Sequence, residues 1–252
     1  MIELNAVTKT YGETTVVDSV TTTIPAGGLT SIIGPNGAGK STLLGLISRL
    51  LPMDGGSVSV GGLDVAGTPS KTLARTLSIL RQENQVSLRL RVRDLVTFGR
   101  FPHTGGRPTS EDRVHVEAAL AHLDLTELAD RYLDELSGGQ RQRAFIAMVL
   151  AQDTDYILLD EPLNNLDMKH SVEMMRLMRG LADEAGKTVV VVLHDINFAS
   201  SYSDTILAMR QGALTAQGSP DQIMRTEVLS QIYDLEIPIH EVAGKRIGVY
   251  FS

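Results

Sequence analysis

A glycine-rich stretch carries the residue pattern that binds nucleotide phosphates. A β-branched run at 29–33 leads into it and a helical pattern follows, which is the context that the sequence GxxxxGK[ST] requires. Glycines let the backbone curl so that several N–H groups point at one anion, and the positive end of the following helix adds to the same site. Lys40 can reach the β- and γ-phosphates of ATP, and the Ser41 hydroxyl can hold Mg²⁺. The residues predicted to bind ATP here are Gly34, Pro35, Asn36, Gly37, Ala38, Gly39, Lys40, Ser41 and Thr42.

Two acidic residues and one histidine follow other apolar runs. YILLDEP (156–162) ends in Asp160, which is expected to approach Mg²⁺, and Glu161, which is expected to orient or deprotonate the attacking water. Two acids often terminate a strand, so this interpretation depends on the phosphate loop earlier in the chain. His194 follows TVVVVL and is expected to donate a hydrogen bond to the γ-phosphate, because parallel strand ends converge on one crevice. The candidate catalytic residues are therefore Glu161, His194 and Lys40, and the candidate metal ligands so far are Ser41 and Asp160.

A second anion-binding helix start lies about 100 residues further along the chain. Ser137, Gly138, Gly139 and Gln140 precede a strongly helical run, so freed backbone amides and a hydroxyl gather at a helix terminus. One chain has no evident use for two γ-phosphate sites. Two chains arranged head-to-tail do, if each of these segments covers the nucleotide held by the other chain's phosphate loop.

Short β-branched runs alternate with longer helical patterns, which predicts an α/β fold with a largely parallel sheet. The glycine pairs 55–56 and 61–62 indicate tight turns between antiparallel strands in the N-terminal part. Residues 86–153 carry three helical patterns and no convincing strand, which predicts a helical lobe inserted into the α/β core. The expected strands are 2–7, 15–24, 29–33, 57–60, 77–80, 156–159, 188–193, 205–209 and 213–217.

Composition narrows the classes of protein. The chain has 252 residues, a formal net charge of -7 and no tryptophan, which argues against nucleic acid as a partner. There is no cysteine, so disulfides, thiolate catalysis and cysteine-ligated zinc are excluded. The apolar runs are strand-sized, and the N-terminus does not resemble a secretory signal. The chain is expected to be soluble by itself, with any membrane role arising through a partner.

The complete set of motifs resembles an ABC transporter ATPase from end to end, and LSGGQRQR (136–143) is the most specific of them. The resemblance implies a P-loop NTPase core with an N-terminal antiparallel β portion, an inserted helical lobe, and one nucleotide-binding domain over residues 1–252. It also implies that Tyr11 stacks on adenine, although a tyrosine near a strand end is often plain packing. Gln82 would contact Mg²⁺ and relay nucleotide state, and Asp167 would cross the dimer interface. The usual stretch before that acid is Ser-Ala-Leu, whereas this chain has Asn164-Asn165-Leu166.

VRDLVTFGRFPH (92–103) and DEPLNNLDMKHSVEMMRLMR (160–179) are similar to the ATPases of bacterial ferric-siderophore importers. The implied partners are a second copy of the chain, two integral-membrane permease subunits and, indirectly, a substrate-binding protein. The implied location is the cytoplasmic face of the inner membrane, as a peripheral subunit. A cobalamin or heme importer, an exporter with separate membrane subunits and a soluble ABC ATPase remain alternatives. A basic cluster in the helical lobe is expected to face the membrane subunit or simply solvent; it comprises Arg89, Arg91, Arg93 and Arg100.

Overall fold

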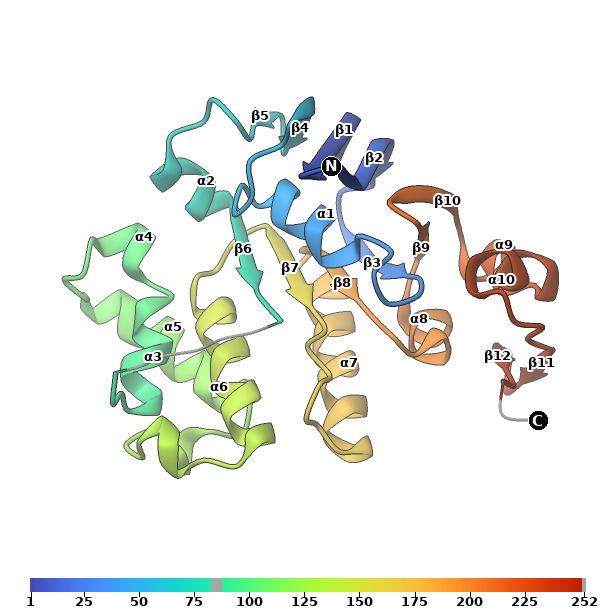
Figure 1. Cartoon of the computed structure of the whole chain (residues 1–252). Helices are drawn as coiled ribbons and strands as arrows, with labels where there is room; N and C mark the ends of the chain where they lie inside the picture. The colour runs from blue at the N-terminus through green and yellow to red at the C-terminus, as the bar shows by residue number, and fades with distance from the viewer. Residues whose placement is uncertain (83–87, 251–252) are drawn as a thin grey trace.

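The computed structural model describes residues 1–82 and 88–250, and a six-stranded sheet runs through its centre (Figure 1). The strands of this sheet are β3 (Gly28–Ile33), β6 (Leu77–Leu80), β7 (Tyr156–Asp160), β8 (Thr188–Val192), β9 (Thr205–Arg210) and β10 (Ala213–Gly218). Their order is β10-β9-β3-β8-β7-β6, and all neighbours are parallel except β10, which runs antiparallel to β9. The carboxyl ends of β3, β7 and β8 therefore meet at one edge, where the phosphate loop, the two acids and the histidine follow.

A second sheet is antiparallel and is formed by N-terminal residues, as predicted. Its strands are β1 (Ile2–Tyr11), β2 (Thr14–Ile24), β4 (Gly55–Val60) and β5 (Leu63–Asp64), in the order β2-β1-β4-β5. Gly61 and Gly62 form the turn between β4 and β5. The prediction of a turn at 55–56 is wrong, because both glycines lie inside β4 at a register shift against β1. Gly56 has a φ of +83°, and a Cβ there would lie 2.4 Å from the carbonyl oxygen of Asn5, so this glycine allows close strand pairing at a bulge.

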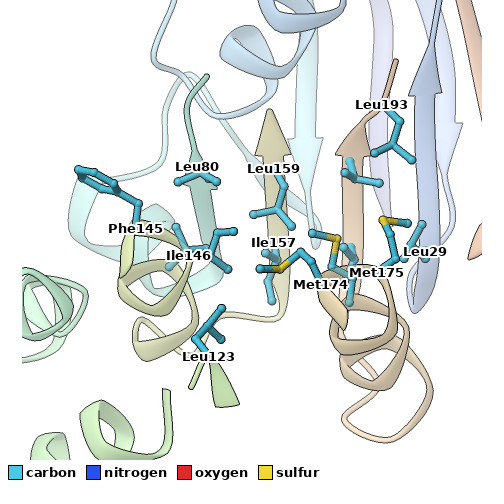
Figure 2. Close-up of a cluster of buried hydrophobic side chains, with 14 of the residues drawn as sticks. Leu29, Leu80, Leu123, Phe145, Ile146, Ile157, Leu159, Met174, Met175 and Leu193 are labelled. Carbon is cyan, nitrogen blue, oxygen red and sulfur yellow. The ribbon is translucent and has the colours of Figure 1, made fainter. Parts of the chain in front are cut away.

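Helices cover the parallel sheet and bury its side chains. The core helices are α1 (Lys40–Ile47), α2 (Ser70–Thr76), α7 (Met168–Asp183) and α8 (Ile196–Tyr202). Every residue of β8 is buried: Val189 and Val191 pack in the cluster that includes α7, and the other two valines pack in the cluster that includes α1. Figure 2 shows Met174 and Met175 of α7 against the sheet. Burial on both faces explains the uninterrupted apolar run in the sequence, at about 1.5–3 kcal/mol for each fully buried large apolar side chain.

Residues 92–151 form the helical part of the molecule, apart from the β-bridge of Arg91 with Tyr132 at its border. It contains α3 (Val92–Phe98), α4 (Phe101–Thr104), α5 (Ser110–His122), α6 (Gly138–Ala151) and the 3₁₀ turns η1 (Thr126–Leu128) and η2 (Leu133–Glu135). The sequence predicted three helices because the four-residue α4 is too short to show a periodic pattern. The predicted start of the lobe at residue 86 lies outside the described residues.

The C-terminal part, for which no strand is expected after residue 217, is ordered into short elements. These are α9 (Pro220–Ile223), α10 (Thr226–Tyr233), β11 (Ile239–Val242) and β12 (Lys245–Gly248), the last two forming a hairpin. The side-chain amide of Asn197 on α8 donates to the carbonyl of Gly248 at 3.2 Å and accepts from its N–H at 2.8 Å. This contact ties the hairpin to the core. Within residues 1–82 and 88–250, no helix combines the length and apolarity needed to cross a membrane.

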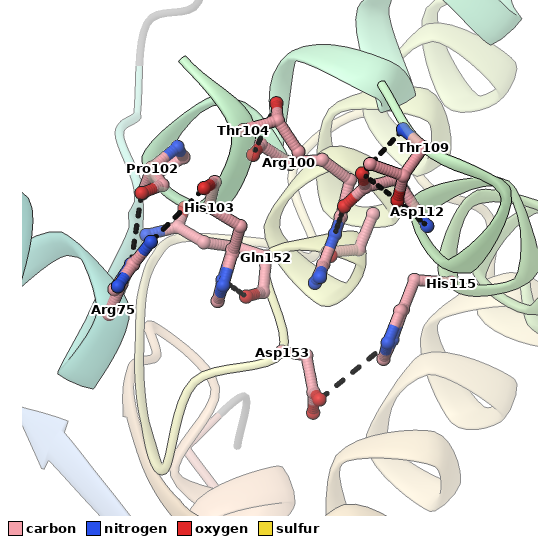
Figure 3. A network of polar contacts seen from close by, with 11 residues as sticks. Arg75, Arg100, Pro102, His103, Thr104, Thr109, Asp112, His115, Gln152 and Asp153 are labelled. Carbon is pink, nitrogen blue, oxygen red and sulfur yellow. Dashed lines mark hydrogen bonds and ion pairs between the residues drawn. The ribbon is translucent and has the colours of Figure 1, made fainter. Parts of the chain in front are cut away.

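The expected exposed basic cluster loses one member in the structure. Arg100 is only 5% exposed, and its guanidinium donates to Asp112 Oδ1 at 2.8 Å and to the carbonyl of Ala151 at 2.9 Å. Figure 3 shows this pair inside a network in which Arg75 donates to the carbonyl oxygens of Pro102 and His103. Arg100 therefore joins α4, α5 and the end of α6, and it cannot belong to a face that contacts a partner. The sequence pattern does not reveal that the Asp112 carboxylate is buried inside the lobe and needs a cation beside it.

Replacing Arg100 with methionine is expected to destabilise the chain by about 3–5 kcal/mol, because a buried carboxylate loses its cation. Burial alone would raise the pKa of Asp112, but the backbone N–H of Thr109, the Arg100 guanidinium and the Thr109 hydroxyl outweigh it and lower the pKa to about 2. This stabilisation is present above the usual range near 3.8 and is lost as the pH falls towards 2. Urea unfolding at neutral pH measures the change in free energy.

The control is Arg93→Met, whose guanidinium pairs with Glu117 on the surface and is 38% exposed. An exposed pair contributes about 0–1 kcal/mol, so this variant is expected to unfold near the parent's midpoint. Equal stability losses in the two variants would contradict the special role of the buried pair.

Candidate active site

The phosphate loop joins β3 to α1 and forms one wall of a cavity of about 460 Å³. Three of its glycines have positive φ: Gly34 at 142°, Gly37 at 78° and Gly39 at 95°. A Cβ on Gly34 would lie 2.1 Å from the carbonyl oxygen of Met209, and one on Gly39 would lie 2.4 Å from that of Val16. The loop can curl this tightly only with glycine at these positions. The cavity is lined by Val16, Asn36, Gly37, Ala38, Gly39, Lys40, Ser41, Thr42, Gln82, Glu161 and His194.

Lys40 is a buried cation at the first turn of α1. Its ammonium group donates to the carbonyl oxygens of Gly34 at 2.8 Å and Pro35 at 2.9 Å, so the loop fixes the charge beside its own backbone. Burial lowers the pKa of Lys40, while the carboxylates of Glu161 and Asp160 oppose that effect. A fixed ammonium group at the start of a helix is suited to attract phosphate oxygens.

Asp160 is the last residue of β7, and it lies against Ser41 of α1. The Ser41 hydroxyl donates to Asp160 Oδ1 at 2.9 Å, although 119 residues separate the two in the sequence. Burial raises the pKa of Asp160, and the hydrogen bond from Ser41 opposes that rise. A hydroxyl and a carboxylate are hard oxygen donors of the kind that Mg²⁺ prefers. Because the Asp160 carboxylate is buried, a bound cation would stabilise its negative charge. Ser41 and Asp160 therefore fit a magnesium ion.

Glu161 is the centre of the polar contacts in the cavity. It has a φ of +50° at the end of β7, and it is 8% exposed. His194 Nε2 lies 2.7 Å from Glu161 Oε1, and Gln82 Nε2 donates to Glu161 Oε2 at 2.8 Å. Gln82 and His194 thus both contact the Glu161 carboxylate, although the sequence indicates the three residues for separate reasons. That carboxylate lines the same cavity as the phosphate loop, where it can orient a water molecule towards a bound phosphate.

The other predicted residues lie outside this cavity. Tyr11 is the last residue of β1, half exposed, and the Lys9 ammonium lies 5.3 Å from its ring centroid. Ser137 caps α6: its hydroxyl accepts from the backbone N–H of Gln140 at 3.3 Å, and its own N–H donates to Gln140 Oε1 at 3.0 Å. Asp167 caps α7 and accepts from the backbone N–H of His170 at 2.9 Å. The LSGGQ segment and Asp167 therefore do not complete the cavity within one chain.

Two residues that the sequence analysis does not assign to the site also belong to it. Val16 lines the cavity from β2, and no local pattern distinguishes it from the other valines of that strand. Asn164 donates its side-chain amide to Glu161 Oε2 at 2.7 Å. The available signal was its position three residues after Glu161, but that spacing becomes meaningful only when the intervening turn is known.

Comparison with known proteins agrees with this geometry. The sequence profile of the ABC transporter family matches residues 17–164. The chain is 55% identical over 252 residues to the petrobactin import ATP-binding protein YclP of Bacillus subtilis (strain 168), with 100% of both chains covered.

Solved structures share the fold. A metal-chelate type ABC transporter in an inward-facing conformation matches with a TM-score of 0.85 and 25% identity, covering 100% of this chain and 97% of that one. The ATP-binding cassette MJ0796, a dimer bound to ADP and Pi, matches with a TM-score of 0.79 and 32% identity, covering 87% of this chain and 99% of that one. On the strength of its motifs, fold and relatives, the chain belongs to the ABC transporter family, as one of its ATP-binding, ATP-hydrolysing proteins.

Proposed function

We propose that the chain binds and hydrolyses ATP to power an importer of ferric siderophores. The observation that carries the catalytic part is the position of the Glu161 carboxylate, which lines one cavity with the phosphate loop and contacts both Gln82 and His194. The cargo is supported by the full-length identity of 55% to the petrobactin import protein.

The phosphate loop and the residues around it have distinct roles in this proposal. Lys40 neutralises the β- and γ-phosphates, Tyr11 stacks on adenine, and His194 donates to the γ-phosphate. Glu161 organises the attacking water, so charge forming on the phosphoryl group meets fixed donors and little reorganisation is needed. The loop that surrounds the remaining phosphate oxygens comprises Gly34, Pro35, Asn36, Gly37, Ala38, Gly39, Ser41 and Thr42, and it would bind them through the backbone N–H groups of the residues other than proline.

Mg²⁺ belongs to the same proposal. Ser41, Asp160 and Gln82 would hold it, and its contribution is to neutralise the phosphate charge. Support comes from the hydrogen bond between Ser41 and Asp160 and from the burial of that carboxylate. The Gln82 amide donates to Glu161 in this structure, so it would have to turn its oxygen to the metal.

The active unit is proposed to be a homodimer. The LSGGQ segment lies outside the cavity of its own chain and presents a helix start, with Ser137, Gly138, Gly139 and Gln140, to a nucleotide held by a second copy. Asp167 would cross the same interface. The dimeric form of the related cassette MJ0796 supports this arrangement.

The chain would lie on the cytoplasmic face of the membrane as a peripheral subunit bound to two permease subunits. A substrate-binding protein would deliver the cargo to these permease subunits. One nucleotide-binding domain is proposed, with an α/β core at residues 1–85 and 154–252 and a helical lobe at 86–153. Gln82 contacts Glu161 and is followed in the chain by that lobe, so it can pass a change at the γ-phosphate to the permease.

The cargo proposal predicts a selective loss of uptake. Deleting the gene is expected to abolish accumulation of radiolabelled iron supplied as a ferric siderophore, for which ferric petrobactin is the first probe, and Glu161→Gln is expected not to restore it. Uptake of cobalamin and heme should remain at the parent level, since neither cargo would use this subunit. Loss of cobalamin or heme uptake with intact ferric-siderophore uptake would contradict the proposed cargo but not the proposed ATPase activity.

A further inference from the structure

The Glu161 carboxylate receives a contact from Asn164 in addition to those from Gln82 and His194. Asn164 Nδ2 lies 2.7 Å from Oε2, the same oxygen that accepts from Gln82 Nε2 at 2.8 Å. An ionised carboxylate only accepts hydrogen bonds, so the amide of Asn164 must turn its nitrogen and not its oxygen to it. The contact therefore has one workable orientation.

The backbone of this turn brings Asn164 to Glu161. Glu161 and Asn165 both have positive φ, at +50° and +64°, and the N–H of Asn164 donates to the carbonyl oxygen of Glu161 at 3.2 Å. Asparagine accepts the left-handed conformation more readily than most residues, so Asn165 suits its position. The chain folds back after β7, and the side chain three residues on reaches the carboxylate.

The three donors differ in what else they face. Gln82 and His194 line the cavity, where they are proposed to meet the metal and the γ-phosphate, whereas Asn164 is absent from the lining that the described residues form. When Gln82 and His194 contact the metal and the γ-phosphate instead of Glu161, Asn164 can still donate its hydrogen bond to Glu161 Oε2. We propose that Asn164 is a positioning residue that holds the Glu161 carboxylate during hydrolysis, an inference that rests on the proposed role of Glu161.

The test is a KM-against-kcat comparison of ATP hydrolysis by the purified full-length chain. Asn164→Ala is expected to lower kcat roughly ten- to a hundredfold, because one hydrogen bond to a charged group is lost. The KM for ATP is expected to stay within about twofold of the parent, since the phosphate loop is untouched. Asn164→Ser, which keeps a donor, is expected to regain part of that loss, and Asn164→Asp, which places a second carboxylate there, is expected to be slower than Asn164→Ala.

Asn197→Ala is the matched control, because its amide holds the C-terminal hairpin and makes no hydrogen bond to Glu161 among the described residues. It is expected to lower the melting temperature and leave kcat near the parent value. Asn164→Ala with parent-like kcat, a loss of kcat no greater than that of Asn197→Ala at equal stability, or Asn164→Asp as fast as Asn164→Ser would each overturn the proposal. If Asn164→Ala unfolds, the ordering of the serine and aspartate variants decides. Near-parent turnover in Glu161→Gln would instead remove the proposed role of Glu161, so the two failures are distinguishable.

Discussion

Glu161→Gln is expected to bind ATP as the parent does and to hydrolyse it roughly 10²–10⁴-fold more slowly, the range that a positioned general base contributes. The amide keeps the shape of the side chain but lacks the negative charge that organises water. Asn164 and His194 contact different oxygens of Glu161. In glutamine one of these oxygens becomes an NH₂ group that cannot accept a hydrogen bond, so one of the two donors loses its acceptor. Phosphate release measures the rate, and size exclusion with ATP is expected to show an accumulated dimer.

The matched control for this prediction is Glu184→Gln, the same change at an exposed residue at the end of α7. Its turnover is expected to equal that of the parent. Near-normal hydrolysis by Glu161→Gln would place the catalytic carboxylate elsewhere in the chain.

Lys40→Ala is expected to lose tight ATP binding, with Kd rising on the order of a hundredfold or more. Truncating one member of a buried charge pair costs about 2–5 kcal/mol, and the β- and γ-phosphates would lose the fixed cation. The loop carbonyls of Gly34 and Pro35, which accept from the Lys40 ammonium at 2.8 and 2.9 Å, would also lose their donor. Isothermal calorimetry with ATP measures the affinity directly.

Lys71→Ala serves as the control, since Lys71 is an exposed residue of α2 away from the cavity. Its affinity for ATP should match that of the parent. If Lys40→Ala bound ATP within a factor of a few of the parent, Lys40 would have no part in holding the phosphates.

Much of the fold follows from local patterns in the sequence. β8 is readable because each of its residues is buried in a parallel sheet, which leaves an unbroken β-branched run. The prediction at Gly56 is wrong because a bulge and a turn can both place a glycine at positive φ, and the sequence does not distinguish them. The sequence does not predict the C-terminal hairpin because its strands have four residues each and only Gly248 among them is buried, so they show little hydrophobic periodicity.

The site was predictable in its residue types but not in its contacts. Convergence of parallel strand ends predicted that Glu161 and His194 would lie near the phosphate loop, and the geometry places them there. Sequence reasoning could not show that Gln82 and Asn164 share one oxygen of Glu161, because that depends on a turn with two residues at positive φ. The prediction for Arg100 is wrong for a similar reason: its partner Asp112 lies twelve residues away, and only tertiary packing buries the pair.

The most direct test of the account is the direction of transport in a reconstituted system. Vesicles would contain this chain with its permease subunits and enclosed ATP, and radiolabelled ferric petrobactin with its receptor would be added outside. We predict that iron accumulates inside, that ATP hydrolysis rises when the loaded receptor is added, and that both effects disappear with Glu161→Gln. ATP-driven movement of cargo away from the nucleotide side, or hydrolysis that ignores receptor and cargo, would contradict the claim that this ATPase powers ferric-siderophore import.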